Sequence, residues 1–281
     1  ALDGEKAEYQ YSYNYQSWYP SAEYETNNTI KNIGLFDLTP FSKFEIKSEN
    51  AHQELQKICT ANIKNEIGKC TYTHMLNPDG GIETDLTVVC LDKNYFRIIS
   101  SAATRERDKF HINKYLSKDI ELIDVTDDYC VFGLFGPKSR DLIQTISEDH
   151  FENDKFKFGT GKNIIIEGIN VWAQRLSYVG ELGYELYTEF NDAKRLYELI
   201  IEKGKDFNLS NCGMHSMDIM RMESGFLHWG HDISPEENQY QAGLSFTISN
   251  KKDVDFIGKA SLNKIKNKKN SSRFAMFTLK D

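Results

Sequence analysis

Several features that would place a chain in a membrane or secreted class are lacking in this sequence of 281 residues. No apolar run approaches the roughly 18 residues that a membrane-spanning helix needs. The N-terminus also lacks the charged and then apolar pattern of a secretion signal. We therefore expect a soluble chain that is neither anchored nor exported.

Cysteine is scarce, and its spacing shows no pairing. The five cysteines are an odd number, lie far apart and never form a C-x-x-C pair. Neither a disulfide framework nor a zinc ribbon is therefore indicated. This pattern fits a reducing compartment, so we expect a cytoplasmic location.

The sequence also lacks a recognisable pattern of metal ligands. His228 and His231 lie close together, but no cysteine or carboxylate pattern joins them and no H-E-x-x-H motif occurs. Such a pair is more typical of a loop than of a metal centre. We predict no metal site.

An excess of positive charge and the common nucleotide-binding motifs are lacking too. The formal net charge of -8 and the pI near 5.5 argue against nucleic acid or an anionic membrane as a partner, because nothing would attract a polyanion. The run GTGKN at 159–163 is not a P-loop, since Asn163 stands where a Ser or Thr is required, and no G-x-G-x-x-G occurs. The chain therefore has no visible site for ATP, NAD or FAD.

Apolar periodicity, by contrast, is abundant from residue 41 onward and predicts two successive units of similar plan. The first is predicted to hold a helix capped by Asn50, a helix over 104–116, and strands over 41–47, 71–76, 85–91, 95–100 and 120–125. The second is predicted to hold helices from Pro137 and from near Asn191, a hairpin over 163–178 that turns at Glu167-Gly168, and strands over 130–136 and 183–190. Beyond them we predict a helix over 212–223, with Met214, Met217 and Met220 on one side, and a strand over 244–248.

The order of these elements predicts the fold class. Each unit runs through a strand, a helix, hairpin strands and a helix, which resembles the ferredoxin-like split βαβ arrangement. This pattern favours an α+β assembly over a doubly wound sheet.

The first candidate for a functional side chain is Asp85. In GGIETDLTV (80–88) a tight turn delivers Asp85 into the start of a largely apolar strand. A buried carboxylate is costly unless it meets a hydrogen-bond donor. The alternative is an aspartate that only bonds its own turn.

The second candidate is Glu185, inside the apolar strand of RLSYVGELGYELY (175–187). A carboxylate there invites a ligand with an amide or guanidine-like edge, whereas the alternative is a hairpin rim with exposed acids. A third pair, Asp218 and Arg221, has the i, i+3 spacing of an ion pair on a helix face. We interpret that pair as structural.

Five separated segments, in this order, resemble signatures of the aminomethyltransferase (glycine cleavage T-protein) family. They are GLFDLTPFSKFEI (34–46), KCTYTHMLNPDGGIETDLTV (69–88), LFGPKS (134–139), YVGELGYEL (178–186) and DFIGKASL (255–262). Within that family, the chain is most similar to the folate domain of sarcosine and dimethylglycine dehydrogenases, which an FAD domain precedes. Met217 and Ser100 stand where aminomethyltransferases proper carry an Arg and an Asn, which favours the dehydrogenase-like branch.

The resemblance implies two ferredoxin-like domains and a C-terminal β-barrel around a central hole that holds tetrahydrofolate. The first domain would comprise 1–42 and 128–235, and the second, inserted into it, 43–127. Residues 236–281 would be the start of a truncated barrel. We therefore expect the chain to be a piece of a longer protein.

The resemblance also implies site residues. Asp85 matches the carboxylate beside the folate N10, Glu185 matches the acid that meets the pterin ring, and Tyr72 and Tyr178 match tyrosines that line the folate pocket.

The activity implied by the resemblance is capture of an iminium or formaldehyde unit from an N-methyl or aminomethyl donor, as 5,10-methylene-tetrahydrofolate. A flavin dehydrogenase domain or a lipoyl carrier protein would be the partner. The alternatives are aminomethyl transfer in the glycine cleavage system, non-catalytic folate binding, and methyl transfer from a sulfonium.

Overall fold

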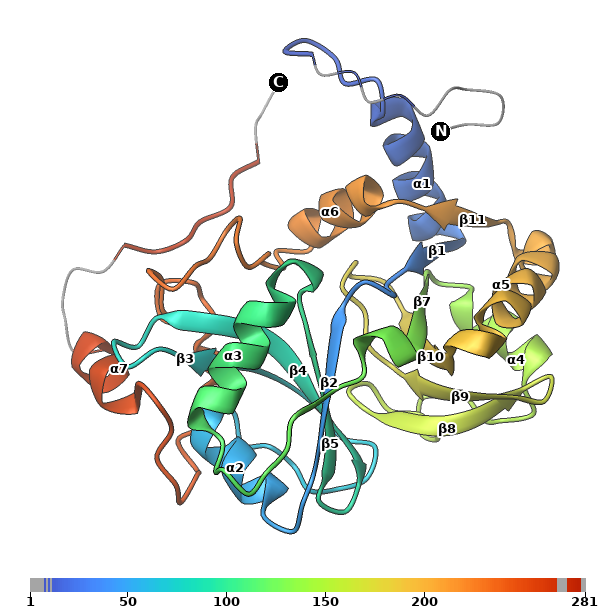
Figure 1. The fold of residues 1–281 in the computed structure, drawn as a ribbon. Helices are drawn as coiled ribbons and strands as arrows, with labels where there is room; N and C mark the ends of the chain where they lie inside the picture. The colour runs from blue at the N-terminus through green and yellow to red at the C-terminus, as the bar shows by residue number, and fades with distance from the viewer. Residues whose placement is uncertain (1–7, 9, 11, 267–271, 279–281) are drawn as a thin grey trace. The chain divides into compact units, whose positions relative to one another are not determined.

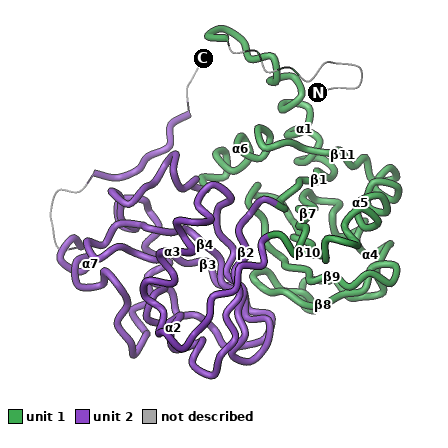
Figure 2. Tube along the Cα trace, viewed as in Figure 1, with its two compact units in different colours: residues 1–39, 127–226 green, residues 40–126, 227–281 purple. Residues whose placement is uncertain are grey.

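The computed structural model describes residues 8, 10, 12–266 and 272–278 (Figure 1). The chain divides into two compact units (Figure 2). Unit 1 comprises residues 1–39 and 127–226, and unit 2 comprises residues 40–126 and 227–281. Each unit contains one sheet and its own hydrophobic core.

Unit 1 is built on a mixed sheet of six strands in the order β11-β1-β7-β10-β9-β8. The first two strands pair in parallel, and all other neighbours are antiparallel. The strands are β1 (Ile33–Asp37), β7 (Tyr129–Phe135), β8 (Gly161–Ile166), β9 (Ile169–Gln174), β10 (Gly183–Glu189) and β11 (Leu209–Cys212).

Two helices supply much of the core on one face of this sheet. The helices of unit 1 are α1 (Tyr19–Lys31), α4 (Ser139–Ile146), α5 (Phe190–Gly204) and α6 (Met214–Glu223), with a 3-10 turn η3 at Lys205–Phe207. Side chains of α4 and α5 pack against Tyr184 and Leu186 of β10. Because side chains alternate along a strand, Glu185 and Tyr187 point to the opposite face of the sheet.

Unit 2 contains an antiparallel sheet of five strands in the order β3-β4-β5-β2-β6. The strands are β2 (Ser42–Lys47), β3 (Cys70–Leu76), β4 (Ile82–Asp92), β5 (Tyr95–Ser100) and β6 (Ile123–Asp124). The helices and 3-10 turns are α2 (Ala51–Ile58), η1 (Ala102–Thr104), α3 (Arg105–Tyr115), η4 (Ser245–Thr247) and α7 (Lys259–Lys266). A further 3-10 turn, η2 (Thr126–Asp128), lies where the chain passes from unit 2 to unit 1.

Helices α2 and α3 cover one face of this second sheet. Leu55, Ile58 and Ile112 pack there with Leu86 and Val88 of β4. The alternation along β4 therefore directs Asp85 to the other face. A smaller cluster forms where the C-terminal segment packs on the turn end of the β3–β4 hairpin, through Leu76, Ile82, Leu227, Ile233, Ala242, Phe256 and Leu262.

These sheets and helices confirm the predicted α+β class. The predicted strand over 244–248 is wrong, because this segment contains the 3-10 turn η4. Of the three methionines predicted on one side of α6, Met217 and Met220 are buried and Met214 is 58% exposed. In the described part of 236–281 the helical elements are η4 and α7, and the barrel stays a prediction, as do the ferredoxin-like details and the central hole.

Candidate functional site

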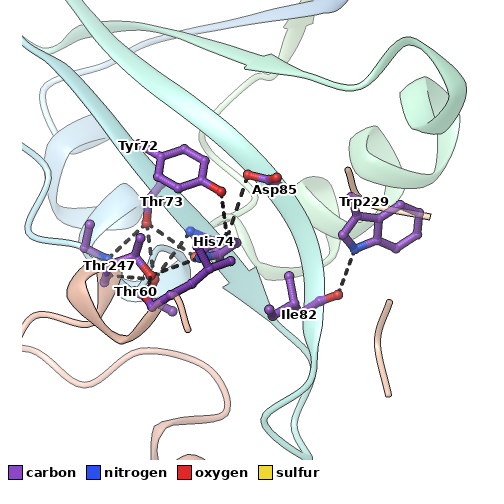
Figure 3. Close-up of polar contacts among 10 residues, drawn as sticks. Thr60, Tyr72, Thr73, His74, Ile82, Asp85, Trp229 and Thr247 are labelled. Carbon is purple, nitrogen blue, oxygen red and sulfur yellow. Dashed lines mark hydrogen bonds and ion pairs between the residues drawn. The ribbon is translucent and has the colours of Figure 1, made fainter. Parts of the chain in front are cut away.

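Asp85 lies on β4 directly opposite His74 of β3 (Figure 3). The Asn77 side-chain oxygen closes the turn between the two strands by accepting hydrogen bonds from the backbone N–H groups of Asp79 (3.0 Å) and Gly81 (2.9 Å). A register shift between Met75 and Leu76 then brings His74 opposite Asp85. The Asp85 side chain is 17% exposed and that of His74 is fully buried. The hairpin therefore places the Asp85 carboxyl group at the boundary between the buried His74 side chain and solvent.

A short chain of polar groups surrounds this carboxylate. The Tyr72 hydroxyl lies 3.3 Å from His74 Nε2 and also hydrogen-bonds to Asp85. His74 Nε2 lies 3.8 Å from Asp85 Oδ1, and His74 Nδ1 lies 3.0 Å from the Thr247 hydroxyl. Because Tyr72 is 39% exposed, its ring can contact a ligand while its hydroxyl contacts these neighbours.

Burial dominates the electrostatics of these groups. It raises the pKa of Asp85 to about 7, the negative charge of Asp108 raises it further, and the hydrogen bond from Tyr72 opposes the rise. Burial also lowers the pKa of His74 to about 3, so its ring is neutral. Asp85 therefore exchanges a proton near neutral pH beside a neutral imidazole.

A second acid on α3, Asp108, lies near Asp85. It is 1% exposed and accepts hydrogen bonds from the hydroxyls of Thr84 (3.2 Å) and Thr104 (2.6 Å). Burial raises the pKa of Asp108 as well. Its carboxylate is thus a structural neighbour that shifts the proton affinity of Asp85.

Glu185 is placed in unit 1 by the pairing of β10 with two strands. It lies opposite Gln174 of β9 and Gly133 of β7. Its Oε2 atom accepts hydrogen bonds from the Gln174 amide (3.1 Å) and from the Tyr187 hydroxyl (2.8 Å). Burial raises the pKa of Glu185, and these two bonds oppose the rise. Such a prepared carboxylate suits a ligand edge with two donors.

Tyr178 lies in the loop between β9 and β10 and is half-buried. Its ring stacks on that of Phe226, with the centroids 6.1 Å apart. The loop depends on Gly180, whose φ is +79° and whose added Cβ would lie 2.1 Å from the Ser224 hydroxyl oxygen. Of the predicted site residues, Tyr72 and Asp85 thus lie together in unit 2, and Tyr178 and Glu185 lie in unit 1.

The remaining candidates are structural. Arg221 Nε donates to Asp218 Oδ1 at 2.7 Å, and Arg221 Nη1 donates to the Phe226 carbonyl at 3.1 Å, which confirms the predicted ion pair on the helix. The rings of His228 and His231 lie 4.3 Å apart in a loop. Among residues that the structure describes, no cluster of three or more His, Cys, Asp or Glu side chains could hold a metal ion.

The sequence interpretation missed three residues around this site: His74 and Asp108, which influence or contact Asp85, and Thr247, which contacts His74. Counting outward from the Asn-Pro-Asp-Gly-Gly turn pairs His74 with Thr84, and only the register shift between Met75 and Leu76, which the sequence does not mark, brings His74 opposite Asp85. Thr247 and Asp108 come from segments distant in sequence, and no local pattern marks them.

Comparison with known sequences finds one matching family model and several relatives that are about one third identical to this chain. The family model described as the GCVT N-terminal domain matches residues 2–252. The chain is 35% identical over 263 residues to 4-methylaminobutanoate oxidase (formaldehyde-forming) of Paenarthrobacter nicotinovorans, covering 93% of this chain and 32% of that protein. It is 33% identical over 279 residues to the mitochondrial dimethylglycine dehydrogenase of Rattus norvegicus, covering 98% and 32%. The aminomethyltransferase of Halothermothrix orenii is 32% identical over 259 residues, with 91% of this chain and 71% of that protein covered.

Solved structures share the fold. The glycine cleavage system aminomethyltransferase T of Bartonella henselae superposes with a TM-score of 0.78 at 19% identity, covering 92% of this chain and 71% of that one. A heterotetrameric sarcosine oxidase from Corynebacterium sp. U-96 gives a TM-score of 0.52 at 12% identity, covering 69% and 95%. The chain spans about a third of the oxidase and dehydrogenase sequences that it matches. Among the described helices, none has the length and apolar character needed to cross a membrane.

Proposed function

Because this chain belongs to the family of the GCVT N-terminal domain, as its sequence motifs predicted, we propose that it captures a one-carbon unit on tetrahydrofolate. The unit would be formaldehyde or an iminium derived from an N-methylated amine. The observation that carries the proposal is Asp85, a mostly buried carboxylate that exchanges a proton near neutral pH beside the ring of Tyr72. The family shares folate-dependent one-carbon transfer, and the donor is the proposed part.

The choice of an N-methylated donor is supported by the relatives. Two of them carry names that refer to oxidation of methylated amines, and one name states that formaldehyde is formed. Since this chain matches only about a third of each, we propose that a flavin domain or partner subunit produces the one-carbon unit. A cytoplasmic location stays a prediction.

The residues of this chain fit the role of holding a reduced folate. When bound, tetrahydrofolate supplies the two amines that take up the one-carbon unit. Ionised Asp85 would accept a hydrogen bond from an amine, orient its lone pair and stabilise the positive charge that develops on it. With a pKa of about 7, the same carboxyl group would take the proton that the amine loses as the new C–N bond forms and would return it to the departing hydroxyl group, which leaves as water.

Glu185 would orient the ligand without taking part in the chemistry. A pterin ring presents adjacent N–H donors, and a carboxylate held by Gln174 and Tyr187 can accept them in a bidentate pair. Tyr72 and Tyr178 would supply aromatic faces for the ring systems of the ligand.

The test separates binding from chemistry. Asp85→Asn should still bind tetrahydrofolate in a fluorescence titration, but the rate of formaldehyde capture above the uncatalysed background should fall about 100-fold. Glu185→Gln should instead weaken binding. Asp92→Asn and Glu189→Gln, at exposed ends of the same two strands, are matched controls expected to behave as wild type. Wild-type capture rates in Asp85→Asn would refute the role of Asp85.

A second candidate function is aminomethyl transfer in glycine cleavage. The 32% identity to an aminomethyltransferase, over 71% of that protein, supports it. Release of ammonia from a lipoyl protein that carries an aminomethyl group, with no capture of free formaldehyde above background, would favour this function. Tight folate binding with neither activity would favour a non-catalytic role.

A further inference from the structure

We propose that His74 and Thr247 are positioning residues: Thr247 fixes the tautomer of His74, and His74 acts through Tyr72 to favour the protonated form of Asp85. The inference deepens the proposed function, because it concerns the proton state of the same carboxylate. It begins from a row of side chains in unit 2 (Figure 3). Thr247 lies 3.0 Å from His74 Nδ1, and the Tyr72 hydroxyl lies 3.3 Å from His74 Nε2 and hydrogen-bonds to Asp85.

The hydrogen bonds of Thr247 fix the tautomer of His74. A threonine hydroxyl carries one proton, and that of Thr247 donates to the Leu244 carbonyl at 2.7 Å. The same oxygen lies 3.0 Å from His74 Nδ1, where it can then only accept. His74 therefore carries its proton on Nδ1. Because the buried ring is neutral, Nε2 has a lone pair and no proton.

The lone pair of His74 Nε2 has two polar neighbours. His74 Nε2 faces the Tyr72 hydroxyl at 3.3 Å and Asp85 Oδ1 at 3.8 Å. When Asp85 is ionised, the nitrogen and the carboxylate are both acceptors, and the single proton of Tyr72 is drawn to the carboxylate. The lone pair of Nε2 then faces a negative charge inside the protein, which is unfavourable.

One added proton satisfies the whole set. A protonated Asp85 donates to the Tyr72 oxygen, and Tyr72 then donates to His74 Nε2. Each acceptor has a donor, and no buried charge remains among the three groups. The imidazole in this tautomer thus favours neutral Asp85, in the same direction as burial does.

One surrounding charge, that of Asp108, acts on Asp85 in the same direction, and it is unchanged in the Thr247 and His74 variants. Asp108 of α3 hydrogen-bonds to Thr84, on the opposite face of β4 from Asp85, and its negative charge disfavours the ionised form of Asp85. The neighbouring cation on that helix, Arg107, pairs with Glu83 of β4 and lies over the Trp229 ring, its guanidinium carbon 4.3 Å from the centroid. From the C-terminal segment, the ring of Phe246 packs 6.3 Å from that of Tyr72 and is uncharged.

The tautomer can be measured directly in the ligand-free protein. Nitrogen-15 spectra of histidine-labelled protein distinguish protonated from unprotonated ring nitrogens, and His74→Gln identifies the signals of His74. We expect Nδ1–H in the wild type and in Thr247→Ser, which keeps the hydroxyl. In Thr247→Val the acceptor is lost, so the proton should move to Nε2. A wild-type ring protonated on Nε2 would overturn the proposal.

The effect on Asp85 is measured by carbon-13 titration of aspartate carboxyl signals, with Asp85→Asn providing the assignment. In Thr247→Val, an Nε2–H group can donate to ionised Asp85, and in His74→Gln the amide can do the same. Both variants should lower the pKa of Asp85 by about one unit, while Thr247→Ser should leave it unchanged. An unchanged pKa of Asp85 in both folded variants would overturn the inference.

These measurements need no folate, so their outcome is independent of the proposed activity. If Asp85→Asn retains full formaldehyde capture while the titration shifts are observed, the proposed function fails and the positioning role stands. If formaldehyde capture depends on Asp85 but the pKa of Asp85 does not shift in the variants, the proposed function stands and the positioning role fails. If Thr247→Val fails to fold, His74→Gln still tests the effect on Asp85, and the tautomer of the wild-type ring still tests the role of Thr247.

Discussion

Asp85 lies where ionisation of its carboxyl group destabilises the folded state. Its pKa of about 7 in the native state lies well above the value of about 4 that an unfolded aspartate has. The native state therefore binds more protons than the unfolded state between these two values. The contribution of this group to stability is complete below about pH 4 and is lost as the pH rises through 7.

Replacing this group gives a prediction with a definite sign. Asp85→Asn cannot ionise, so at about pH 8 it should resist urea better than the wild type, by on the order of 3 kcal/mol. The difference should fade as the pH falls toward 4, where both side chains are neutral. Urea titrations at the two pH values measure it. A variant less stable than the wild type at the higher pH would contradict a buried, destabilising charge.

Side chains of the candidate site differ in how well sequence could predict them. Tyr72 and Asp85 lie on one hairpin with a recognisable turn, but alternation counted from that turn would place them on opposite faces. The register shift between Met75 and Leu76 brings them to one face. Glu185 and Gln174 also lie on neighbouring strands of a hairpin-like segment. Thr247 could not be predicted, because its position depends on how the C-terminal segment packs on β3, and no local periodicity encodes such packing.

Entire strands and helices were predictable where their periodicity is strong. Strands β2, β5, β8 and β9 lie where apolar alternation placed them, and the turn at Glu167-Gly168 has the positive φ angles that a tight hairpin needs. Helix α1 was missed because the residues that it buries, Ala22, Thr26 and Thr29, are small or polar. Strands β1 and β11 were missed because both are short and pair across a long separation in sequence.

In the turn of the β3–β4 hairpin, Gly81 packs so closely on the C-terminal segment that a side chain does not fit there. A Cβ added to Gly81 would lie 1.8 Å from the Pro235 carbonyl oxygen, so an alanine would force the turn and the C-terminal segment apart. We expect Gly81→Ala to lose on the order of 2–3 kcal/mol of stability. Gly213→Ala, whose nearest neighbour would be 3.7 Å away, is the control and should change little. Equal urea midpoints for the two variants would contradict the clash.

All five cysteines lie among the described residues and are free, so no disulfide joins any of them. Cys59, Cys90 and Cys130 are buried, and burial raises the pKa of Cys59 to about 12 and that of Cys90 to about 11. A buried thiol that resists ionisation reacts slowly. The packing of the two cores therefore protects the cysteines that they contain.

The rate at which the cysteines react with a thiol reagent tests whether packing protects them. A disulfide reagent at about pH 8 should modify the buried cysteines slowly in the native state and all five at once in denaturant. The melting temperature should not change when a reductant is added. Fewer than five reactive thiols after denaturation without reductant would show that a disulfide forms.

The placement of β1 between β7 and β11 has a consequence for synthesis on the ribosome. The strands of unit 2 are contiguous in sequence and are all available once Asp124 has emerged, whereas β1 has no sheet partner until β7 emerges and its second edge waits for Cys212. A nascent chain therefore exposes the apolar segment 33–37 during much of its translation. Chains stalled after residue 126, on a linker that fills the exit tunnel, should crosslink to chaperones through this segment, and chains stalled after residue 226 should not.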